Sequence, residues 1–123
     1  MKFSEETNAN QNNITRYGEG FIEIKGKKID TSVIISRETF ITSWQPQSFG
    51  ELSPEHCLLL VENKPDAILL GTGKTQQFPE HEILKLFAQH QIGIEVMDTS
   101  AACRTFNILL SEDRNVVAGL FMI

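Results

Sequence analysis

Residues 67–75 read A-I-L-L-G-T-G-K-T, a short apolar run that ends in two glycines, a lysine and a threonine. An apolar run of this length is typical of a strand that is covered on both faces of a sheet. Residues 78–91 follow with apolar side chains at helical spacing, and residues 92–97 form a second apolar run. A strand, a helix and a strand in this order predict a βαβ unit, with parallel strands and a right-handed crossover.

The segments on either side of this unit predict one α/β domain with an antiparallel β portion in front. Gly26 is expected to turn the chain between two antiparallel strands. Ser53, Pro54 and Glu55 have the order of a helix start: a cap, a proline at the first helical position and an acid in the first turn. The further elements expected are strands over 17–24, 29–36 and 39–43, helices over 54–62 and 99–110, and a final strand over 116–122. We expect residues 1–13 to be a disordered polar tail and residues 14–123 to be the domain.

Composition and charge limit the classes of function. The chain has 123 residues, an apolar fraction of 41% and a formal net charge of −5. A protein that binds duplex nucleic acid normally carries a basic patch, so nucleic acid is not an expected partner. No apolar run approaches the ~18 residues that cross a bilayer, and the first residues lack the apolar segment of a secretory signal. We therefore expect a cytoplasmic protein that is not an integral membrane protein.

The stretch that follows the first apolar run imitates a phosphate-binding loop without matching one. A Walker A loop has the pattern G-x-x-x-x-G-K-[ST], whose backbone N–H groups wrap the phosphates. Gly73-Lys74-Thr75 fits its end, but its first glycine would have to stand at Ile68, inside the apolar run. The dinucleotide pattern G-x-G-x-x-G also fails, because its third glycine would be Gln76. No cofactor is expected.

The carboxyl ends of parallel strands border a crevice in which α/β proteins commonly bind ligands. Gly71-Thr72-Gly73 ends one expected strand and Met97-Asp98-Thr99 ends the other, so the two segments are expected to face each other. The same residues have a purely structural explanation, because any turn between a strand and a helix needs glycines and capping residues. The candidate ligand-binding residues are Gly71, Thr72, Gly73, Asp98, Thr99, Arg104, Thr105 and Asn107.

Cysteine and histidine supply weaker candidates for chemistry. Cys103 is expected in the first turns of the helix over 99–110, where a thiol can have a lowered pKa. No histidine has a spacing that places it beside this thiol, and a small buried cysteine is the simpler interpretation. The histidines share no i, i+4 relation, so no metal site is predicted. Trp44 and Phe49 are expected to form either an exposed contact patch or a lid over the core.

Two segments resemble a small domain family of unknown function. Residues 68–73, I-L-L-G-T-G, and residues 92–120, I-G-I-E-V-M-D-T-S-A-A-C-R-T-F-N-I-L-L-S-E-D-R-N-V-V-A-G-L, carry the resemblance. Residues 16–29, R-Y-G-E-G-F-I-E-I-K-G-K-K-I, look like the opening strands of that family, with Trp44 at its expected tryptophan. The family includes a mitochondrial complex I assembly factor (NADH:ubiquinone oxidoreductase assembly factor 3) and short bacterial and archaeal proteins. The resemblance implies a three-layer domain around a central, mixed, mostly parallel sheet with flanking helices.

The resemblance also implies a pocket, but it supplies no reaction. The pocket would lie where the G-T-G turn meets the M-D-T turn and the helix that carries Arg104, Thr105 and Asn107. This chain departs from the family pattern at two places. Phe106 stands where tyrosine is usual, which removes a hydroxyl from the pocket. Residues 112–115, E-D-R-N, stand where E-G-R-R is common, which loses a basic residue and a turn glycine.

Two functions from different classes are left open. The first is a non-enzymatic interaction or assembly domain that binds a protein partner and is linked to respiratory complex biogenesis. The second is a small-molecule-binding protein, or an unrecognised enzyme, that uses the crevice between the G-T-G and M-D-T turns. The lack of a catalytic constellation in the sequence and the family association favour the first. The catalytic residues of the second, the partner of the first and the oligomeric state do not follow from the sequence.

Overall fold

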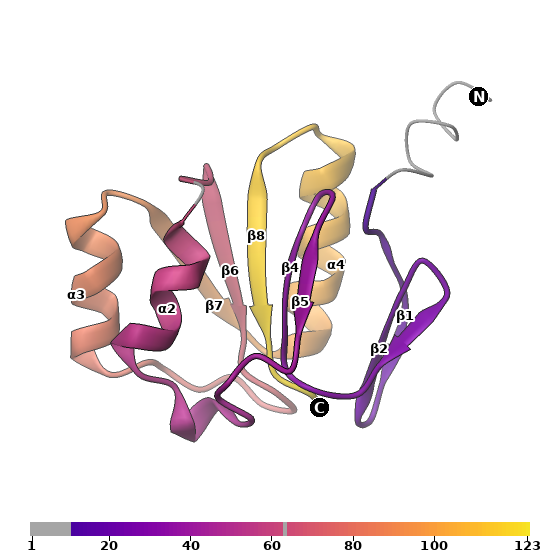
Figure 1. Ribbon diagram of the computed structural model, residues 1–123, viewed down its shortest axis with the longest axis horizontal. Coiled ribbons are helices and arrows are strands. Elements are labelled where there is room, and N and C mark those ends of the chain that lie inside the picture. The colour runs from indigo at the N-terminus through magenta and orange to yellow at the C-terminus, as the bar shows by residue number, and fades with distance from the viewer. Residues whose placement is uncertain (1–10, 63) are drawn as a thin grey trace.

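A computed structural model describes residues 11–62 and 64–123 and shows a mixed α/β fold (Figure 1). The strands are β1 (Ile14–Gly18), β2 (Phe21–Ile24), β3 (Lys27–Ile29), β4 (Val33–Ser36), β5 (Phe40–Thr42), β6 (Ala67–Gly71), β7 (Gly93–Met97) and β8 (Val116–Leu120). The helices are the 3-10 turn η1 (Phe49–Glu51), α2 (Pro54–Val61), α3 (His81–Gln89) and α4 (Thr99–Ser111). The predicted α/β class, with an antiparallel β portion in front, is confirmed.

The elements β6, α3 and β7 form the predicted βαβ unit. β6 pairs in parallel with β7, from Ala67 opposite Gly93 to Gly71 opposite Met97. Its side chains alternate between the two faces of the sheet, since Leu69 belongs to one core and Ile68 and Leu70 to the other. The apolar run that begins at Ala67 is therefore a strand covered on both faces, as predicted.

The strand β8 lies in the centre of the large sheet, although it comes last in the sequence. The order of strands is β5-β4-β8-β6-β7, and β8 pairs in parallel with β6 and antiparallel with β4. The sheet is mixed, as expected, but it is not mostly parallel, because two of its pairings are parallel and two are antiparallel. All residues of β8 are buried. Gly119 lets the ring of Trp44 lie directly on the strand, because a Cβ at this position would come within 2.9 Å of that ring.

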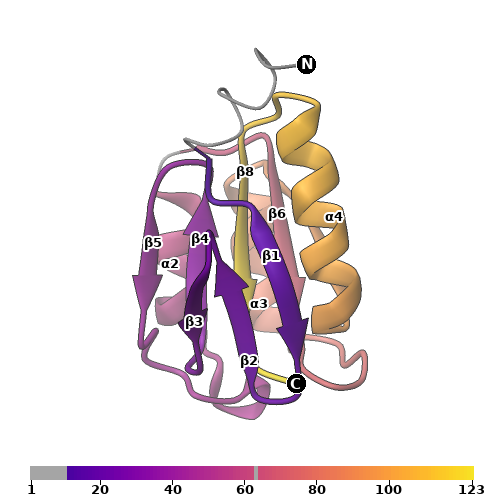
Figure 2. The same ribbon diagram turned by 90° about the vertical axis from the view of Figure 1, so that its right-hand side faces the viewer.

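The strands β1, β2 and β3 form a separate antiparallel sheet beside α4 (Figure 2). The predicted strands over 17–24 and 29–36 are wrong in extent, because the chain turns inside each. Gly20, with φ 79°, separates β1 from β2. Ser32 separates β3 from β4, and its hydroxyl oxygen lies 2.8 Å from the carbonyl oxygen of Trp44. The apolar run over 29–36 thus serves two sheets, which periodicity alone does not reveal.

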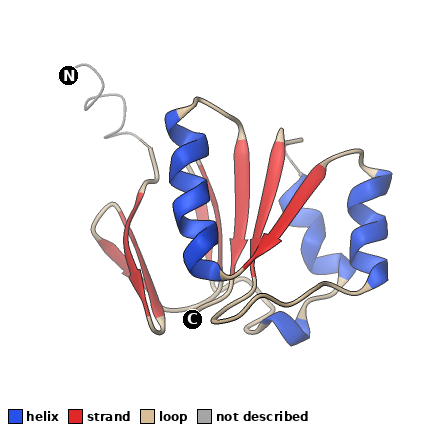
Figure 3. Cartoon of the chain, turned by 180° about the vertical axis from the view of Figure 1, so that it is seen from behind, coloured by secondary structure: helices blue, strands red, loops and turns tan. Residues whose placement is uncertain are grey.

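Helices lie on both faces of the large sheet (Figure 3). α4 packs against β6, β8 and β1 on one face, while α2 and α3 lie together on the other. α2 begins as predicted, with Pro54 as its first residue and a capping box in which the Ser53 N–H donates to His56 Nδ1 at 3.1 Å. The sheet therefore has two apolar cores, one on each face.

The predicted polar tail falls largely outside the described residues, which begin at residue 11. Asn12, inside the predicted tail, is buried. Its backbone N–H donates to the carbonyl oxygen of Arg37 at 2.8 Å, and its side-chain amide donates to that of Ser36 at 3.0 Å. The chain therefore contacts the turn between β4 and β5 two residues before Ile14, where the domain is predicted to begin.

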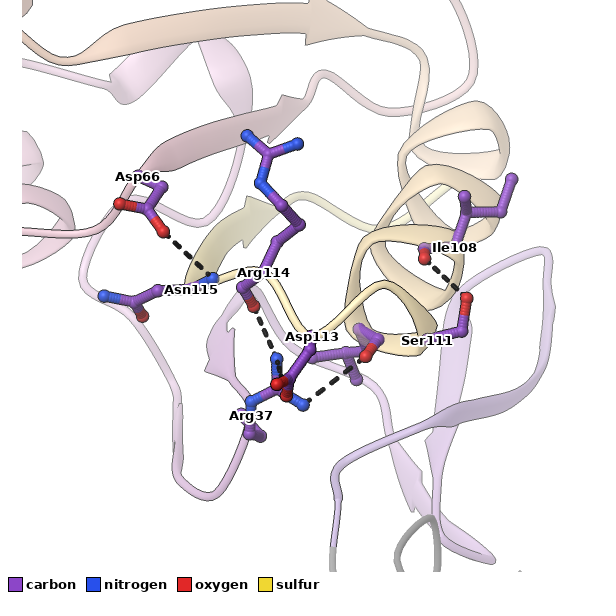
Figure 4. Close-up of polar contacts among 8 residues, drawn as sticks. Arg37, Asp66, Ile108, Ser111, Asp113, Arg114 and Asn115 are labelled. Atoms are coloured by element: carbon purple, nitrogen blue, oxygen red, sulfur yellow. Dashed lines mark hydrogen bonds and ion pairs between the residues drawn. The ribbon is translucent and has the colours of Figure 1, made fainter. Parts of the chain in front are cut away.

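A backbone motif and one arginine hold the connection from α4 to β8 (Figure 4). Asp113 has φ 62°, its N–H donates to the carbonyl oxygen of Leu110 (2.9 Å), and the N–H of Arg114 donates to that of Leu109 (3.0 Å). This is the Schellman arrangement at a helix end. Arg37, in the turn between β4 and β5, donates to the carbonyl oxygens of Arg114 (2.6 Å) and Leu110 (3.4 Å). The guanidinium thus binds the end of α4 where the helix dipole is negative.

Asp113→Gly is expected to raise the free energy of unfolding by about 0.5–1 kcal/mol, because the left-handed conformation is unfavourable for a residue with a Cβ. The glycine of the family pattern E-G-R-R stands at this position. Asp113 also lies 3.6 Å from Arg37, but its side chain is 94% exposed, so the loss of that contact costs little. Urea denaturation measures the change. Asp113→Ala removes the carboxylate and keeps the strain, and a glycine variant that is less stable than this control would contradict the prediction.

Candidate functional site

The two predicted turns lie side by side and are hydrogen-bonded directly to each other. The backbone N–H of Thr72 donates to the carbonyl oxygen of Met97, and the N–H of Thr99 donates to that of Gly73, both at 2.9 Å. The N–H of Gly73 in turn donates to Thr99 Oγ1 at 2.8 Å. The residues Gly71, Thr72, Gly73, Asp98 and Thr99 are called the strand-end cluster below. The sequence correctly predicts that these segments meet.

The hydroxyl of Thr99 joins three parts of the chain. It accepts the hydrogen bond from Gly73 and donates to the carbonyl oxygen of Phe121 at 2.6 Å. The side chain is fully buried, so no water replaces these bonds. Thr99 Oγ1, at the first residue of α4, therefore links the turn after β6 to the segment after β8.

The two glycines of the cluster are required for different reasons. A Cβ at Gly71 would come within 2.9 Å of Leu120 Cδ2 and of Thr99 Oγ1, and within 3.1 Å of the Ala102 methyl carbon. Gly71 thus allows close packing between β6, β8 and α4. Gly73 has φ 105°, a conformation that side chains disfavour. Backbone geometry and packing account for both glycines of the G-T-G sequence.

The polar side chains of the cluster also bond within the protein. Thr72 Oγ1 lies 2.7 Å from the carbonyl oxygen of Thr75 and accepts a hydrogen bond from the Gln77 N–H at 3.1 Å. Asp98 is the N-cap of α4, and its carboxylate accepts a hydrogen bond from the Ala101 N–H at 2.9 Å. The loop after Gly73 is thereby folded back on itself. Asp98 has the structural role of a helix cap.

The candidate residues Arg104 and Asn107 on α4 make their hydrogen bonds to β1 and not to the strand-end cluster. Asn107 accepts a hydrogen bond from the Ile14 N–H and donates one to the Ile14 carbonyl oxygen, both at 2.9 Å. Arg104 Nη1 donates to the Tyr17 hydroxyl at 2.9 Å, and Thr105 is half-buried on the same helix. Arg104 and Asn107 therefore bind β1. Whether any of the eight candidates holds a ligand stays a prediction.

Asn107→Ala is expected to lower the free energy of unfolding by about 1–2 kcal/mol, because it removes two hydrogen bonds and leaves both polar groups of Ile14 without that partner. Detachment of β1 should raise the amide hydrogen exchange of β1 and β2 more than that of β6. Thr105→Ala on the same helix is the control and should change either measurement little. Unaltered exchange in β1 of Asn107→Ala would contradict the prediction.

Burial suppresses the chemistry of the cysteines. Cys57 and Cys103 are free thiols with no exposed surface. Burial raises the pKa of each thiol to about 12; for Cys103 the Arg104 charge lowers the pKa by a smaller effect and the Asp98 charge raises it. A neutral thiol is a poor nucleophile, so the interpretation of Cys103 as a small buried residue is supported over that of a nucleophile.

Both thiols are expected to resist a disulfide reagent at pH 8 in the native state and to react together once the protein is unfolded. Their pKa values are raised from 9.0 to about 12, so the folded protein keeps protons that the unfolded chain loses. This contribution to stability is constant below pH 9 and is lost as the pH rises from about 9 to about 12. Labelling kinetics with and without urea measure the first effect. Rapid native labelling of either thiol would contradict it.

Two further expectations concern aromatic residues. Trp44 is buried and stacks on Phe121, with ring centroids 5.2 Å apart, while Phe49 meets Phe121 edge-on at 6.1 Å. These rings therefore form a lid over the core and not an exposed patch. Phe106, at the position of the usual family tyrosine, is fully buried in the core under α4. The aromatic ring at this position therefore packs in the core.

A cleft of about 420 Å³ lies between β5 and α2 and was not predicted. Its walls include Ile41 from β5, Trp44 from the loop after β5, and Glu55, His56 and Leu59 from α2. We call it the β5–α2 groove. Ile41 is 47% and Leu59 41% exposed. A sequence signal was present, because residues 58–61, L-L-L-V, cannot all face the core from one helix, but the place of β5 at a sheet edge could not be read from it.

Among the residues that the structure describes, no three His, Cys, Asp or Glu side chains gather as a group that could hold a metal ion. No helix within 11–62 and 64–123 is long and apolar enough to span a membrane. The fold and the strand-end cluster thus define a small α/β domain in which the polar groups at the strand ends bond mainly to the protein itself. The chain belongs to the family described as protein of unknown function (DUF498/DUF598), whose sequence model matches residues 14–121.

Named relatives of this chain come from animals and bacteria. It is 31% identical over 108 residues to the NADH dehydrogenase (ubiquinone) 1 alpha subcomplex assembly factor 3 of Xenopus tropicalis, covering 86% of this chain and 58% of the relative. It is 35% identical over 65 residues to the 13 kDa major membrane protein of Francisella tularensis subsp. holarctica (strain LVS), covering 53% of each. The chain spans a little over half the length of these curated relatives.

Solved structures show the same fold. A crystal structure of a protein from Bordetella parapertussis matches with a TM-score of 0.86 and 31% identity, covering 92% of this chain and 97% of that one. A solution structure from Bordetella pertussis, described as a Mth938-like domain, matches with a TM-score of 0.78 and 26% identity, covering 93% and 87%. The family resemblance seen in the sequence is confirmed.

Proposed function

We propose that this protein is a non-enzymatic interaction domain that takes part in the assembly of a respiratory complex. The observation that carries the proposal is the relationship to an assembly factor of NADH dehydrogenase over 86% of the chain. The internal bonding of the strand-end cluster supports it, because Thr72, Asp98 and Thr99 make hydrogen bonds within the protein. A partner that is a protein fits such a domain better than a substrate.

The proposed partner is a protein subunit or subassembly, and not nucleic acid, since the formal net charge is −5. We propose that the domain works in the cytoplasm and reaches membranes through its partner. A relative named as a major membrane protein supports an association with membranes, while no described helix has the length and hydropathy to span one. A domain that binds a membrane-attached subassembly satisfies both observations.

The test uses an affinity-tagged full chain in its own organism. Native electrophoresis of membrane and soluble fractions is expected to show the tagged protein in a band that also contains subunits of NADH:ubiquinone oxidoreductase, and deletion of the gene should lower the amount of the mature complex. Asp113→Ala, which removes a carboxylate that is 94% exposed, is the matched control. Repeated recovery of the protein alone, together with normal complex levels after deletion, would reject the assembly role.

The alternative of a small-molecule site at the strand-end cluster makes a different prediction. A metabolite that binds there should raise the melting temperature by mass action. Such a metabolite would have to contact Asp98, because the hydroxyl of Thr99 is already hydrogen-bonded to Gly73 and Phe121. A thermal-shift screen tests this alternative, and a shift that disappears in Asp98→Ala would favour it over the assembly role.

A further inference from the structure

We propose that the outer edge of β5 and the β5–α2 groove form the docking site for an extended segment of the partner protein. In this arrangement the segment adds a strand to the large sheet, places an apolar side chain in the groove, and carries a basic side chain beside it. The inference deepens the proposed function, because it names the surface through which the interaction domain would bind its partner and the chemistry of that partner.

β5 is an edge strand of the large sheet. β4 and β5 form an antiparallel hairpin in which Ser36 donates to the carbonyl oxygen of Thr39 at 2.9 Å. Bonded and non-bonded pairs alternate along such a ladder, so Ile41 bonds towards Ile34. The N–H and C=O groups of Phe40 and Thr42 consequently point outwards. In the part of the chain that the structure describes, β5 is the edge of the sheet and no strand pairs with this side.

The β5–α2 groove lies beside that edge, because Ile41 of β5 lines it. Ile41 lies opposite Ile34, whose side chain belongs to the core on the α2 side of the sheet. The exposed side chain of Ile41 therefore projects to the same side as Leu59 of α2, and both line the groove. Since side chains alternate along a strand, every second residue of an added segment would project into this groove. Backbone bonds would supply affinity, and the groove would supply selectivity.

A carboxylate lies in the wall of the groove. Of the described residues that line the groove, Glu55 in the first turn of α2 is the only acidic one, and none is a lysine or an arginine. An apolar side chain against Ile41 and Leu59 with a basic side chain two residues away would match this wall. Pairing with a carboxylate at the edge of an apolar groove contributes more to selectivity than to affinity.

Charge also argues against a second copy of this chain as the occupant. Antiparallel pairing of two β5 strands would bring a second α2, with its own Glu55, to the interface. Neither copy would supply a lysine or an arginine from the described residues of its groove, and each copy carries a formal net charge of −5. Like charges at a pairing site are unfavourable, so a partner with a basic segment fits better than self-association.

The test is a titration of the isotope-labelled full chain with two synthetic peptides, observed by NMR. The first is acetyl-Thr-Leu-Thr-Lys-Thr-Leu-Thr-amide, and the second has glutamate in place of lysine. The lysine peptide is expected to bind at least ten times more tightly than the glutamate peptide. On binding, the amide hydrogens of Phe40 and Thr42 should become protected from exchange, whereas that of Ile41, already bonded to β4, should change little. No saturable binding of the lysine peptide would overturn the proposal.

Variants locate the binding. Ile41→Asp and Leu59→Asp should each lower the affinity for the lysine peptide at least tenfold. Leu58→Asp, at an equally exposed apolar residue (49%) that does not line the groove, is the matched control and should bind as the wild type does. Glu55→Lys should reverse the preference between the two peptides. Binding that is unchanged in all these variants, or protection at β7 in place of β5, would overturn the proposal.

Two outcomes separate this inference from the proposed function. If the Ile41→Asp protein is still found with the respiratory subassembly in cells, the groove is not the docking site, and the proposed assembly role is unaffected. If the wild-type protein is never found with such a subassembly but the peptide binds at β5, the assembly role fails and the groove stands. A dimer in sedimentation experiments that Ile41→Asp dissociates would show a second copy as the occupant and would overturn the proposal of a basic partner segment.

Discussion

Replacement of Thr99 by valine is expected to lower the free energy of unfolding by about 2–4 kcal/mol, a large part of the stability of a small domain. Valine keeps the branched shape and removes only the hydroxyl. The N–H of Gly73 and the carbonyl oxygen of Phe121 would then lose the partner that each has at 2.8 Å and 2.6 Å in a buried position. A buried polar group without a partner loses the hydration that it has in the unfolded chain, which is why the cost exceeds that of an exposed hydrogen bond.

Thermal and urea denaturation measure this effect, with an expected fall in melting temperature of roughly 10 °C. Thr99→Ser keeps the hydroxyl and removes one methyl group, so it should lose only about 1 kcal/mol. The comparison separates the hydrogen bonds from the packing. Equal losses in the two variants would mean that the hydroxyl contributes little, which the fully buried position of Thr99 argues against.

The second large effect is expected for Gly71→Ala, which should lower the free energy of unfolding by about 1–3 kcal/mol through overpacking. The new methyl group would lie 2.9 Å from both Leu120 Cδ2 and Thr99 Oγ1 and 3.1 Å from the Ala102 methyl carbon. These neighbours belong to β8 and α4, whose positions are fixed by the sheet and by the Thr99 bonds. They have little room to move apart, so the helix must shift or the strand must bend.

Gly93→Ala is the matched control for this substitution. Gly93 begins β7, and a Cβ at this position would have no neighbour within 4 Å. Because alanine restricts the unfolded chain more than glycine does, the control should be neutral or slightly stabilising. Chemical denaturation of the two variants gives the comparison. A Gly71→Ala protein as stable as Gly93→Ala would show that β6, β8 and α4 are packed less tightly than these distances indicate.

The βαβ unit could be predicted because the strand over 67–70 and the helix after it are each specified by residues that are close together in the sequence. The extent of the N-terminal strands does not. The run over 29–36 looks continuous, yet the chain changes sheets at Ser32, whose hydroxyl contact with Trp44 spans twelve positions. A contact of that range leaves no periodic signal.

The candidate site shows the same division. The sequence correctly brings Gly71-Thr72-Gly73 beside Met97-Asp98-Thr99, since parallel strands end at one edge. It does not reveal that Thr99 also donates to Phe121, because that bond requires knowing that β8 lies next to β6. The β5–α2 groove escaped prediction for a related reason: the edge position of β5 is a property of the whole strand order.

The central position of β8 has a consequence for how the chain is made. Its neighbours β4 and β6 are synthesised before it, and in the folded sheet they are not paired with each other because β8 lies between them. During synthesis we therefore expect the two parts of the large sheet to form before the strand that joins them, each with an open, apolar edge that can pair wrongly. Closure is a late event that begins only when residues 116–120 have emerged. Cooperative folding of the large sheet therefore depends on β8. We expect chaperones to protect the exposed strand edges most when synthesis pauses before β8.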